Sequence, residues 1–228
     1  MNTKPPSTGS LYIIATPIGH PSDITLRALE LLKMVDAIIC EDRRQGSTTL
    51  KKVGINPGTL IELNEHNEQE VTPEILNRLM QGENLALISD CGTPVFADPG
   101  HHLIRQVCEM DIPIVPVPGP SSLTAALSVL NFEIRQFVFG GFLPRQPEAR
   151  RNELRKLRAF RMPVILMDTP YRLETILGEV EAVFGNHQEI TLVCEISLPT
   201  EAIYRGQIHF VKSQLKKPKA EFVLIIHY

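Results

Sequence analysis

Short apolar segments alternate with longer amphipathic segments along the chain. The apolar segments lack the two-residue alternation of a half-exposed strand, which favours strands buried on both faces. In the first half, strands are expected at 11–15, 35–40, 60–63, 85–88 and 114–117. The helices expected between them are 23–34, capped by Ser22 or Asp23, then 73–81 and 102–110. This order predicts a mainly parallel α/β sheet.

The second half continues the alternation but is richer in strands. Its expected helices are 121–130, a basic helix within 145–161, and 172–184. Its expected strands are 137–139, 164–167, 190–195, 202–206 and 222–228. A segment rich in Pro and Gly, at 116–120, separates the halves. The expected organisation is a disordered polar leader at 1–10, an N-terminal α/β domain at 11–117 and a C-terminal α/β domain at 118–228.

Composition and charge narrow the class of protein. The chain has 228 residues, 43% of them hydrophobic, which is enough for a substantial core. Its net charge of −3 argues against a nucleic-acid binder that is basic throughout. No stretch reaches the ~18 apolar residues of a membrane span. The four cysteines are scattered without a CxxC pair, so we expect no metal site, no disulfide framework and a cytoplasmic location.

Small and polar residues follow each of the five strands expected in the first half. Ligands of an open parallel sheet bind beyond the carboxyl ends of its strands, so these loops predict a binding site. The loops are 16–19 (TPIG), 41–44 (EDRR), 64–67 (NEHN), 89–94 (SDCGTP) and 118–122 (PGPSS). A GxGxxG fingerprint, a GxxxxGK[ST] phosphate loop and a GxSxG nucleophile elbow are all missing.

Taken in order, these loops resemble those of one known family. The matching motifs are Thr16-Pro17-Ile18-Gly19 with Asp23-Ile24-Thr25, Glu41-Asp42-x-Arg44, His66-Asn67-Glu68, Ser89-Asp90-x-Gly92-Thr93-Pro94 with Asp98-Pro99-Gly100, Pro118-Gly119-Pro120 and Gly141-Phe142-Leu143-Pro144. From residue 11 to about 228 the chain resembles the tetrapyrrole-methylase superfamily. Within it, the motifs are most similar to the ribosomal branch, the bacterial 16S rRNA (cytidine-2′-O)-methyltransferases.

The resemblance implies two α/β domains of the tetrapyrrole-methylase type, with S-adenosylmethionine (SAM) in the cleft between them. It also implies a homodimer, no metal, and methyl transfer to the ribose 2′-hydroxyl of a cytidine in 16S rRNA. The implied partner is 16S rRNA or the 30S subunit. Two alternatives stay open: a methyltransferase for a tetrapyrrole or another small molecule, and a SAM-binding protein without transfer activity. The second half departs further from the family's motifs than the first, for example at Met167-Asp168-Thr169-Pro170.

Ten positions match cofactor contacts of the family. They are Pro17, Gly19, Asp90, Gly92, Thr93, Ser121, Ser122, Met167, Ile196 and Ala220. The resemblance places Asp90 near the amino-acid or ribose part of SAM, and Gly92 would let the backbone approach closely. The N–H groups of the helix that starts near Ser121 would suit a carboxylate. The alternative is that Asp90 caps a turn and that the last three positions are ordinary core.

A base near the acceptor hydroxyl would assist methyl transfer by taking its proton. The candidate catalytic residues all lie in strand-end loops: Glu41, Asp42, Arg44, His66 and Asp98. Each also has a structural alternative. Glu41 or Asp42 could pair with Arg44. His66 could cap a turn, and Asp98 before a Pro-Gly pair is common turn chemistry.

The segment 145–161 is strongly basic in an otherwise acidic chain. It carries seven arginines and lysines against two glutamates, a local charge of +5 that leaves −8 for the remainder. Such asymmetry fits a surface that faces RNA phosphates. The candidate substrate contacts are Arg145, Arg150, Arg151 and Arg155. A solvated helix face is the alternative.

Overall fold

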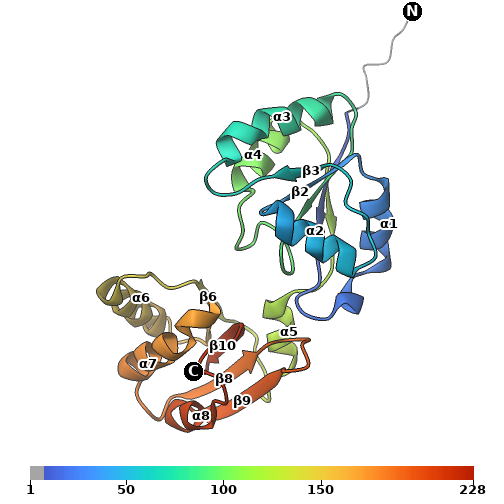
Figure 1. The fold of residues 1–228 in the computed structure, drawn as a ribbon. Coiled ribbons are helices and arrows are strands. Elements are labelled where there is room, and N and C mark those ends of the chain that lie inside the picture. The colour runs from blue at the N-terminus through green and yellow to red at the C-terminus, as the bar shows by residue number, and fades with distance from the viewer. Residues whose placement is uncertain (1–7) are drawn as a thin grey trace, which may run out of the picture. The chain divides into compact units, whose positions relative to one another are not determined.

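The chain separates into two units. In the computed structural model, which describes residues 8–228, the division falls after Ser121. The boundary expected after Val117 lies slightly earlier in the chain. Each unit has its own five-stranded sheet with helices on both faces, so the fold is α/β in both halves (Figure 1).

Most of the leader expected at residues 1–10 lies outside the described residues. Its last two residues belong to the first unit. The N–H of Gly9 donates to the carbonyl of Leu79 at 2.8 Å, and the N–H of Ser10 donates to Oδ1 of Asn84 at 3.1 Å. A Cβ at position 9 would lie 1.7 Å from the carbonyl oxygen of Glu83, so only glycine fits there. The contacts of the first unit therefore begin before the first strand.

The first sheet is entirely parallel. Its strands are β1 (Leu11–Ile14), β2 (Ala37–Cys40), β3 (Leu60–Glu62), β4 (Leu85–Ile88) and β5 (Ile114–Val117), in the order β3-β2-β4-β1-β5. Every neighbouring pair runs in the same direction. The central strands β2 and β4 are buried at every position, which explains why they are apolar throughout rather than alternating.

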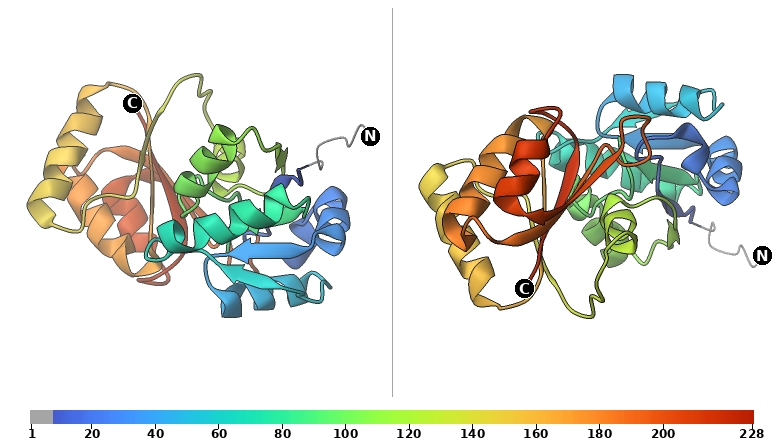
Figure 2. Two further views of the ribbon diagram at one scale, coloured as in Figure 1. Left: turned by 90° about the horizontal axis from the view of Figure 1, so that it is seen from above. Right: turned by 90° about the horizontal axis from the view of Figure 1, so that it is seen from below.

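Two pairs of helices cover the first sheet. Helices α1 (Leu26–Met34) and α2 (Arg43–Lys52) pack on one face, and α3 (Glu68–Met80) and α4 (His101–Glu109) pack on the other. Figures 1 and 2 show the sheet between these two layers. The neighbouring strands β1 and β4 are followed by helices on opposite faces, α1 and α4. Such a switch point is where open α/β sheets bind ligands, at the carboxyl ends of the two strands.

Helix boundaries in the first unit differ from the expected ones in three places. Residues 21–23 form a short 3₁₀ turn, so α1 starts later and its cap is Thr25, whose hydroxyl accepts the N–H of Ala28 at 3.1 Å. Ser22 and Asp23 are therefore not its caps. Helix α2 has no counterpart among the expected elements, and α3 starts at Glu68 with Pro73 inside it.

The second unit contains a mixed sheet. Its strands are β6 (Val138–Gly141), β7 (Val164–Asp168), β8 (Glu189–Cys194), β9 (Ala202–Gln207) and β10 (Phe222–Ile226), in the order β6-β7-β10-β8-β9. Strands β6 and β7 are parallel. Strand β10 lies between β7 and β8 and is antiparallel to both, and β8 is antiparallel to β9.

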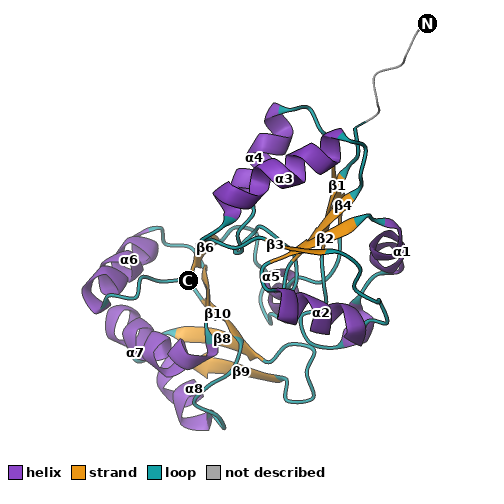
Figure 3. Cartoon of the chain, turned by 45° about the horizontal axis from the view of Figure 1, so that its top comes forward, coloured by secondary structure: helices purple, strands orange, loops and turns teal. Residues whose placement is uncertain are grey.

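Helices also cover both faces of the second sheet. Helices α6 (Pro147–Ala159), α7 (Leu173–Phe184) and α8 (Ile208–Gln214) share the larger core (Figure 3). Helix α5 (Ser122–Ser128) and the chain that follows it pack on the other face. A 3₁₀ turn, Pro170–Arg172, connects β7 to α7. The basic helix matches the expectation from the sequence, whereas α8 has no expected counterpart.

Candidate functional site

Three strand-end loops of the first unit are joined by hydrogen bonds. The N–H of Thr16, after β1, donates to the carbonyl of Gly92, after β4, at 2.9 Å. The hydroxyl of Thr16 donates to the carbonyl of Ser89 at 2.9 Å. The hydroxyl of Thr93 donates to the carbonyl of Pro120, after β5, at 3.2 Å. The TPIG, SDCGTP and PGPSS segments therefore form one structure at the switch point.

Glycine is required where these loops meet. Gly92 has a φ of +85°, and a Cβ there would lie 3.2 Å from Cγ2 of Ile18. A Cβ on Gly119 would lie 2.9 Å from the Cβ of Ala15. Larger residues would push the loops apart, so these glycines set how closely the backbones approach. Pro17 and Gly19, from the first loop, lie beside Ile18 in this cluster and are partly buried.

Asp90 carries a buried oxygen that the described residues leave without a hydrogen-bond partner. This atom is Oδ1. Burial raises the pKa of the Asp90 carboxyl above its ordinary value, and the carboxylates of Asp42 and Asp98 raise it further. An unpaired buried acceptor is costly, so it marks a position where a ligand could donate. The alternative that Asp90 caps a turn finds no support at this oxygen.

Further carboxylates gather around Asp90. Burial is the largest cause that raises the pKa of Glu41, followed by the charges of Asp90 and Asp98 and then by those of Glu65 and Asp42. These side chains follow three different strands, β2, β3 and β4. The parallel sheet thus brings them to one edge and gives that edge a negative potential.

The candidate catalytic residues have distinct environments. Glu41 is partly buried. Asp42 is the N-cap of α2: its Oδ1 accepts the N–H groups of Arg44 and Gln45, both at 2.8 Å. His66 is 84% exposed at its side chain and lies 3.5 Å from Glu65. The arrangement therefore gives Asp42 a structural use and leaves Glu41 as the partly buried acid that follows β2.

The loop that holds Asp98 is strained. Val95 has a φ of +70°, which is rare for a β-branched residue, and Gly100 has a φ of +130°. A Cβ on Gly100 would meet side-chain atoms of Val95 at 3.1 Å and of Leu87 at 3.2 Å. Strain of this kind persists only where the surrounding structure enforces it, and it concentrates at functional loops.

The serines between the sheets lie at the division of the two units. Ser121 is the last residue of the first unit, and Ser122 begins α5 in the second. Both are partly buried. Helix α5 has 7 residues, fewer than the expected 121–130.

The second-unit cofactor candidates do not share one surface. Met167 and Ile196 pack against the core that α5 covers. Ala220 is buried against the opposite core, with α7 and α8. Ile196 is flanked by two residues with left-handed backbone, Glu195 (φ 55°) and Ser197 (φ 66°).

The four candidate substrate arginines also separate. Arg145, which precedes α6, and Arg155, which lies on α6, are exposed. Arg150 is buried, and its guanidinium donates to Glu179 of α7 at 3.1 Å. Arg151 donates to the other oxygen of Glu179 at 2.6 Å while remaining half exposed. The charge of Arg150 is thus used inside the unit rather than presented to an external phosphate.

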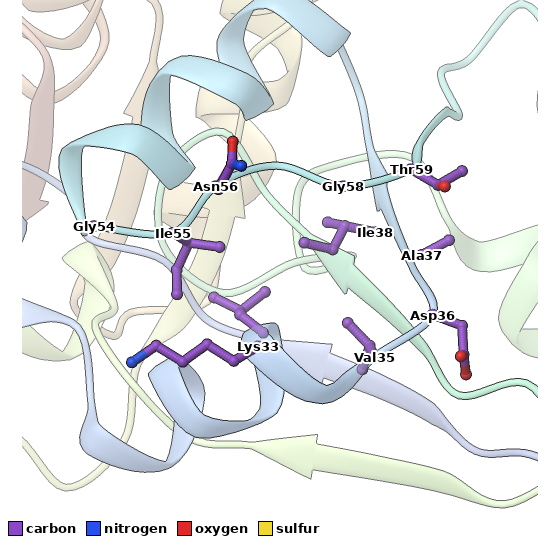
Figure 4. Close-up of a pocket in the computed structure, with 11 residues that line it drawn as sticks. Lys33, Val35, Asp36, Ala37, Ile38, Gly54, Ile55, Asn56, Gly58 and Thr59 are labelled. Atoms are coloured by element: carbon purple, nitrogen blue, oxygen red, sulfur yellow. The ribbon is translucent and has the colours of Figure 1, made fainter.

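A separate pocket lies at the opposite end of the first sheet. It has a volume of ≈ 270 Å³ and is lined by residues near the amino end of β2, including Asp36, Ile38 and Ile55 (Figure 4). Its Asp36 accepts the N–H of Asn84 at 2.8 Å. Because ligands of parallel sheets bind at the carboxyl ends, this pocket is not part of the candidate site.

Residues 8–228 contain neither a metal-binding cluster nor a membrane-spanning helix. Among these residues, no group of three or more His, Cys, Asp or Glu side chains is placed to hold a metal ion. None of the helices described there is both long and apolar enough to cross a membrane.

Comparison with known proteins points to one family. The family model described as tetrapyrrole (corrin/porphyrin) methylases matches residues 10–210. The chain is 39% identical to the ribosomal RNA small subunit methyltransferase I of Escherichia coli O157:H7, over 96% of this chain and 78% of that protein. It is 37% identical to the protein of the same name from Pseudomonas aeruginosa, over 96% of this chain and 79% of that protein.

Solved structures share the fold at low sequence identity. Cobalt precorrin-4 methyltransferase, a cobalamin biosynthetic enzyme, superposes with a TM-score of 0.72 at 16% identity, covering 100% of this chain and 98% of that one. Uroporphyrin-III C-methyl transferase from Thermus thermophilus, solved in complex with S-adenyl homocysteine, gives a TM-score of 0.66 at 19% identity. It covers 96% of this chain and 97% of its own.

Proposed function

The chain belongs to the tetrapyrrole (corrin/porphyrin) methylase family and is a SAM-dependent methyltransferase, and on this premise we propose that its acceptor is the ribose 2′-hydroxyl of a cytidine in 16S rRNA. The observation that carries the proposal is the identity of 39% and 37%, over 96% of the chain, to proteins named ribosomal RNA small subunit methyltransferase I. The same relatives support 16S rRNA or the 30S subunit as partner. A homodimer is part of the proposal and rests on the resemblance of the motifs. A cytoplasmic location is proposed from the scattered cysteines.

The switch point of the first unit suits SAM. Bound there, SAM would supply a methyl group carried on a cationic sulfur. Asp90 offers an unpaired buried oxygen to a donor of the ligand, and Gly92 keeps the loop backbone open to close approach. Pro17 and Gly19 would complete the wall from the TPIG loop, and Thr93 from the SDCGTP loop. The negative potential of the surrounding carboxylates favours a cation over an anion.

The remaining cofactor contacts are proposed from the residues that follow the first sheet along the chain. Ser121 and Ser122 would offer N–H and hydroxyl groups to the ligand's carboxylate. Met167 and Ile196 would provide apolar contacts to the adenine. Ala220 is a weaker candidate for such a contact, because it is buried against the opposite core.

Glu41 is the residue best suited to take the proton of the acceptor hydroxyl. Burial and neighbouring carboxylates raise its pKa, which makes its carboxylate a stronger base than an ordinary glutamate. Asp98 is the second candidate, because it contributes to the same acidic cluster. Asp42 would act by holding the start of α2, where Arg44 lies exposed. His66 is the least supported, since its side chain is open to solvent.

The phosphates that flank the acceptor cytidine are proposed to bind away from the acidic edge, which only the acceptor ribose would reach. Phosphates would be repelled by the carboxylates of the first unit, whereas Arg145, Arg151 and Arg155 offer exposed positive charge on the second. Reversing the charge of Arg145 and Arg155 should weaken RNA binding and lower its salt dependence, with SAM binding unchanged. Reversal of the exposed Lys51 and Lys52 on α2 is the matched control.

Methyl transfer to the small ribosomal subunit tests the proposal. Labelled SAM is incubated with 30S subunits that lack ribose methylation, and the modified nucleotide is identified by mass spectrometry. A 2′-O-methylcytidine product supports the proposal. SAM binding without transfer to 30S subunits would reject it and leave the alternatives, a small-molecule methyltransferase or a SAM-binding protein without transfer. The fold of the corrin and porphyrin enzymes favours testing a tetrapyrrole precursor next.

A further inference from the structure

Three segments of the second unit meet at one edge of its sheet. Strands β7 and β8 run in the same direction because both are antiparallel to β10, and β6 is parallel to β7. The carboxyl ends of β6, β7 and β8 therefore lie at the same edge as the amino end of β10. The loop 142–145 follows β6, the turn 169–172 follows β7, and the basic segment 216–219 precedes β10.

Two arginines fix the backbone of the 142–145 loop. Arg172 donates to the carbonyl of Leu143 at 2.9 Å and to that of Pro144 at 3.0 Å. It also forms an ion pair of 3.1 Å with the buried Asp168. The buried Arg150 donates to the carbonyl of Arg145 at 2.8 Å. A loop held by so many charged donors is rigid before any ligand arrives.

This loop presents one aromatic side chain to solvent, and the turn after β7 presents a second. Phe142 is 50% exposed and Tyr171 is 75% exposed. The segments that carry them are joined by the hydrogen bond from Arg172, which follows Tyr171, to the carbonyl of Leu143, which follows Phe142. The ammonium of Lys219 lies 4.7 Å from the centroid of the Tyr171 ring. Lys216 and Lys217 are exposed in the same basic segment.

We propose that Phe142 and Tyr171 form a platform on which unpaired nucleobases of the acceptor RNA stack, with Arg145 and Lys219 contacting the adjacent phosphates. The proposal rests on the proposed RNA-methylating function and specifies how that RNA is held. Exposed aromatic rings with interleaved cations are the features that bind single-stranded RNA, because each base has a face to stack and each nucleotide a phosphate. Preorganisation by Arg150 and Arg172 lowers the ordering cost of binding.

Substitution of the two rings in the 228-residue chain tests the platform. The probe is a single-stranded, cytidine-containing RNA of ~12 nucleotides. Phe142→Ala and Tyr171→Ala are each expected to raise its Kd by about tenfold or more, with the Kd for SAM unchanged. Phe142→Trp should restore binding, because it restores a stacking face. Phe210→Ala is the matched control. Phe210 is 51% exposed, like Phe142, but lies in α8 and not in the loop or turn that Arg172 joins.

Methyl transfer to 30S subunits by the wild type distinguishes failure of the platform from failure of the proposed function. If the wild type methylates 30S subunits, and the Phe142 and Tyr171 variants bind RNA and turn over like Phe210→Ala, the platform is rejected while the proposed function stands. If the wild type neither binds the RNA nor methylates 30S subunits, both are rejected. Loss of RNA binding in Phe142→Leu together with retention in Phe142→Trp would support stacking over a merely apolar contact.

Discussion

The guanidinium of Arg150 donates to the buried carboxylate of Glu179 at 3.1 Å, although 29 residues separate them in the chain. The same carboxylate accepts Arg151 at 2.6 Å, and this hydrogen bond is the main cause that lowers the pKa of Glu179. One glutamate on α7 thus pairs with two consecutive arginines of α6. The pairing ties the basic helix to the core of the second unit.

Glu179→Gln is expected to destabilise the second unit strongly. The substitution leaves the buried charge of Arg150 without its counter-ion, and such losses cost about 3–5 kcal/mol. The free energy of unfolding in urea measures the effect. Arg151→Ala should cost much less, because Arg151 is half exposed and its removal leaves Glu179 paired with Arg150. Equal losses in the two variants would contradict the central role of the buried pair.

Gly92→Ala is expected to weaken SAM binding and to lower stability by about 1–3 kcal/mol, the cost of a left-handed backbone in a residue with a Cβ. The new methyl group also lies 3.2 Å from Cγ2 of Ile18 and would shift the first loop. Calorimetric titration with SAM and thermal unfolding measure the two effects.

Gly178→Ala is the matched control for this substitution. Gly178 lies inside α7, and a Cβ there has no neighbouring atom within 4 Å. It should stabilise the protein by about 0.5–1 kcal/mol and leave SAM binding unchanged. A weaker Kd for SAM in this variant too would mean that the Gly92 effect is not local.

Asp90→Asn is expected to stabilise the protein without SAM at neutral pH while weakening SAM binding. The folded pKa of Asp90 is raised, so the folded state binds more protons than the unfolded state between the ordinary and the raised value. Stability contributed by this group is therefore present at low pH and lost as pH rises through that interval. Urea unfolding at several pH values should show the gain of the variant shrinking on acidification. A gain that does not depend on pH would mean that the charge of Asp90 is not its cause.

Glu41→Gln is expected to lower the rate of methyl transfer by on the order of 10²–10⁴, the usual contribution of a general base. SAM binding should remain within error of the wild type. Single-turnover transfer to 30S subunits gives the rate. In the wild type, this rate should rise with pH over a range above the ordinary pKa of a glutamate, because the pKa of Glu41 is raised. Glu65→Gln, an exposed acid at the next strand end, is the control. A full rate in Glu41→Gln would shift the role to Asp98.

The parallel core of the first unit could be predicted from the sequence because its strands have a distinctive composition. Strand β4 coincides with the expected 85–88, since a strand buried on both faces is apolar at every position and ends abruptly. Strand β5 coincides with the expected 114–117 although it is an edge strand and only partly buried. Helix α2 escapes prediction because its only buried residues are Gly46 and Leu50, too few for a periodic pattern. Asp42, identified for its chemistry, is also the signal that this helix begins.

The candidate site is predicted by the sequence as a set of loops rather than as a geometry. Sequence order places Asp90 and Glu41 after strands, but only the strand order β2-β4-β1 brings those ends together. Arg150 resembles a surface charge in the sequence because its partner, Glu179, lies 29 residues away and no local pattern joins them. Tyr171 and Lys219, likewise distant in sequence, give no signal beyond an aromatic residue and a basic segment.

The position of β10 in the second sheet has a consequence for synthesis. Strands β7 and β8 each pair with β10 rather than with each other. While residues 122–221 are being made, both strands lack the partner that lies between them, and their apolar edges stay open. The C-terminal unit can therefore close only after translation has passed Ile226, whereas the all-parallel first unit already has every strand of its sheet. A ribosome stalled shortly before that point would carry a folded N-terminal unit joined to an aggregation-prone chain.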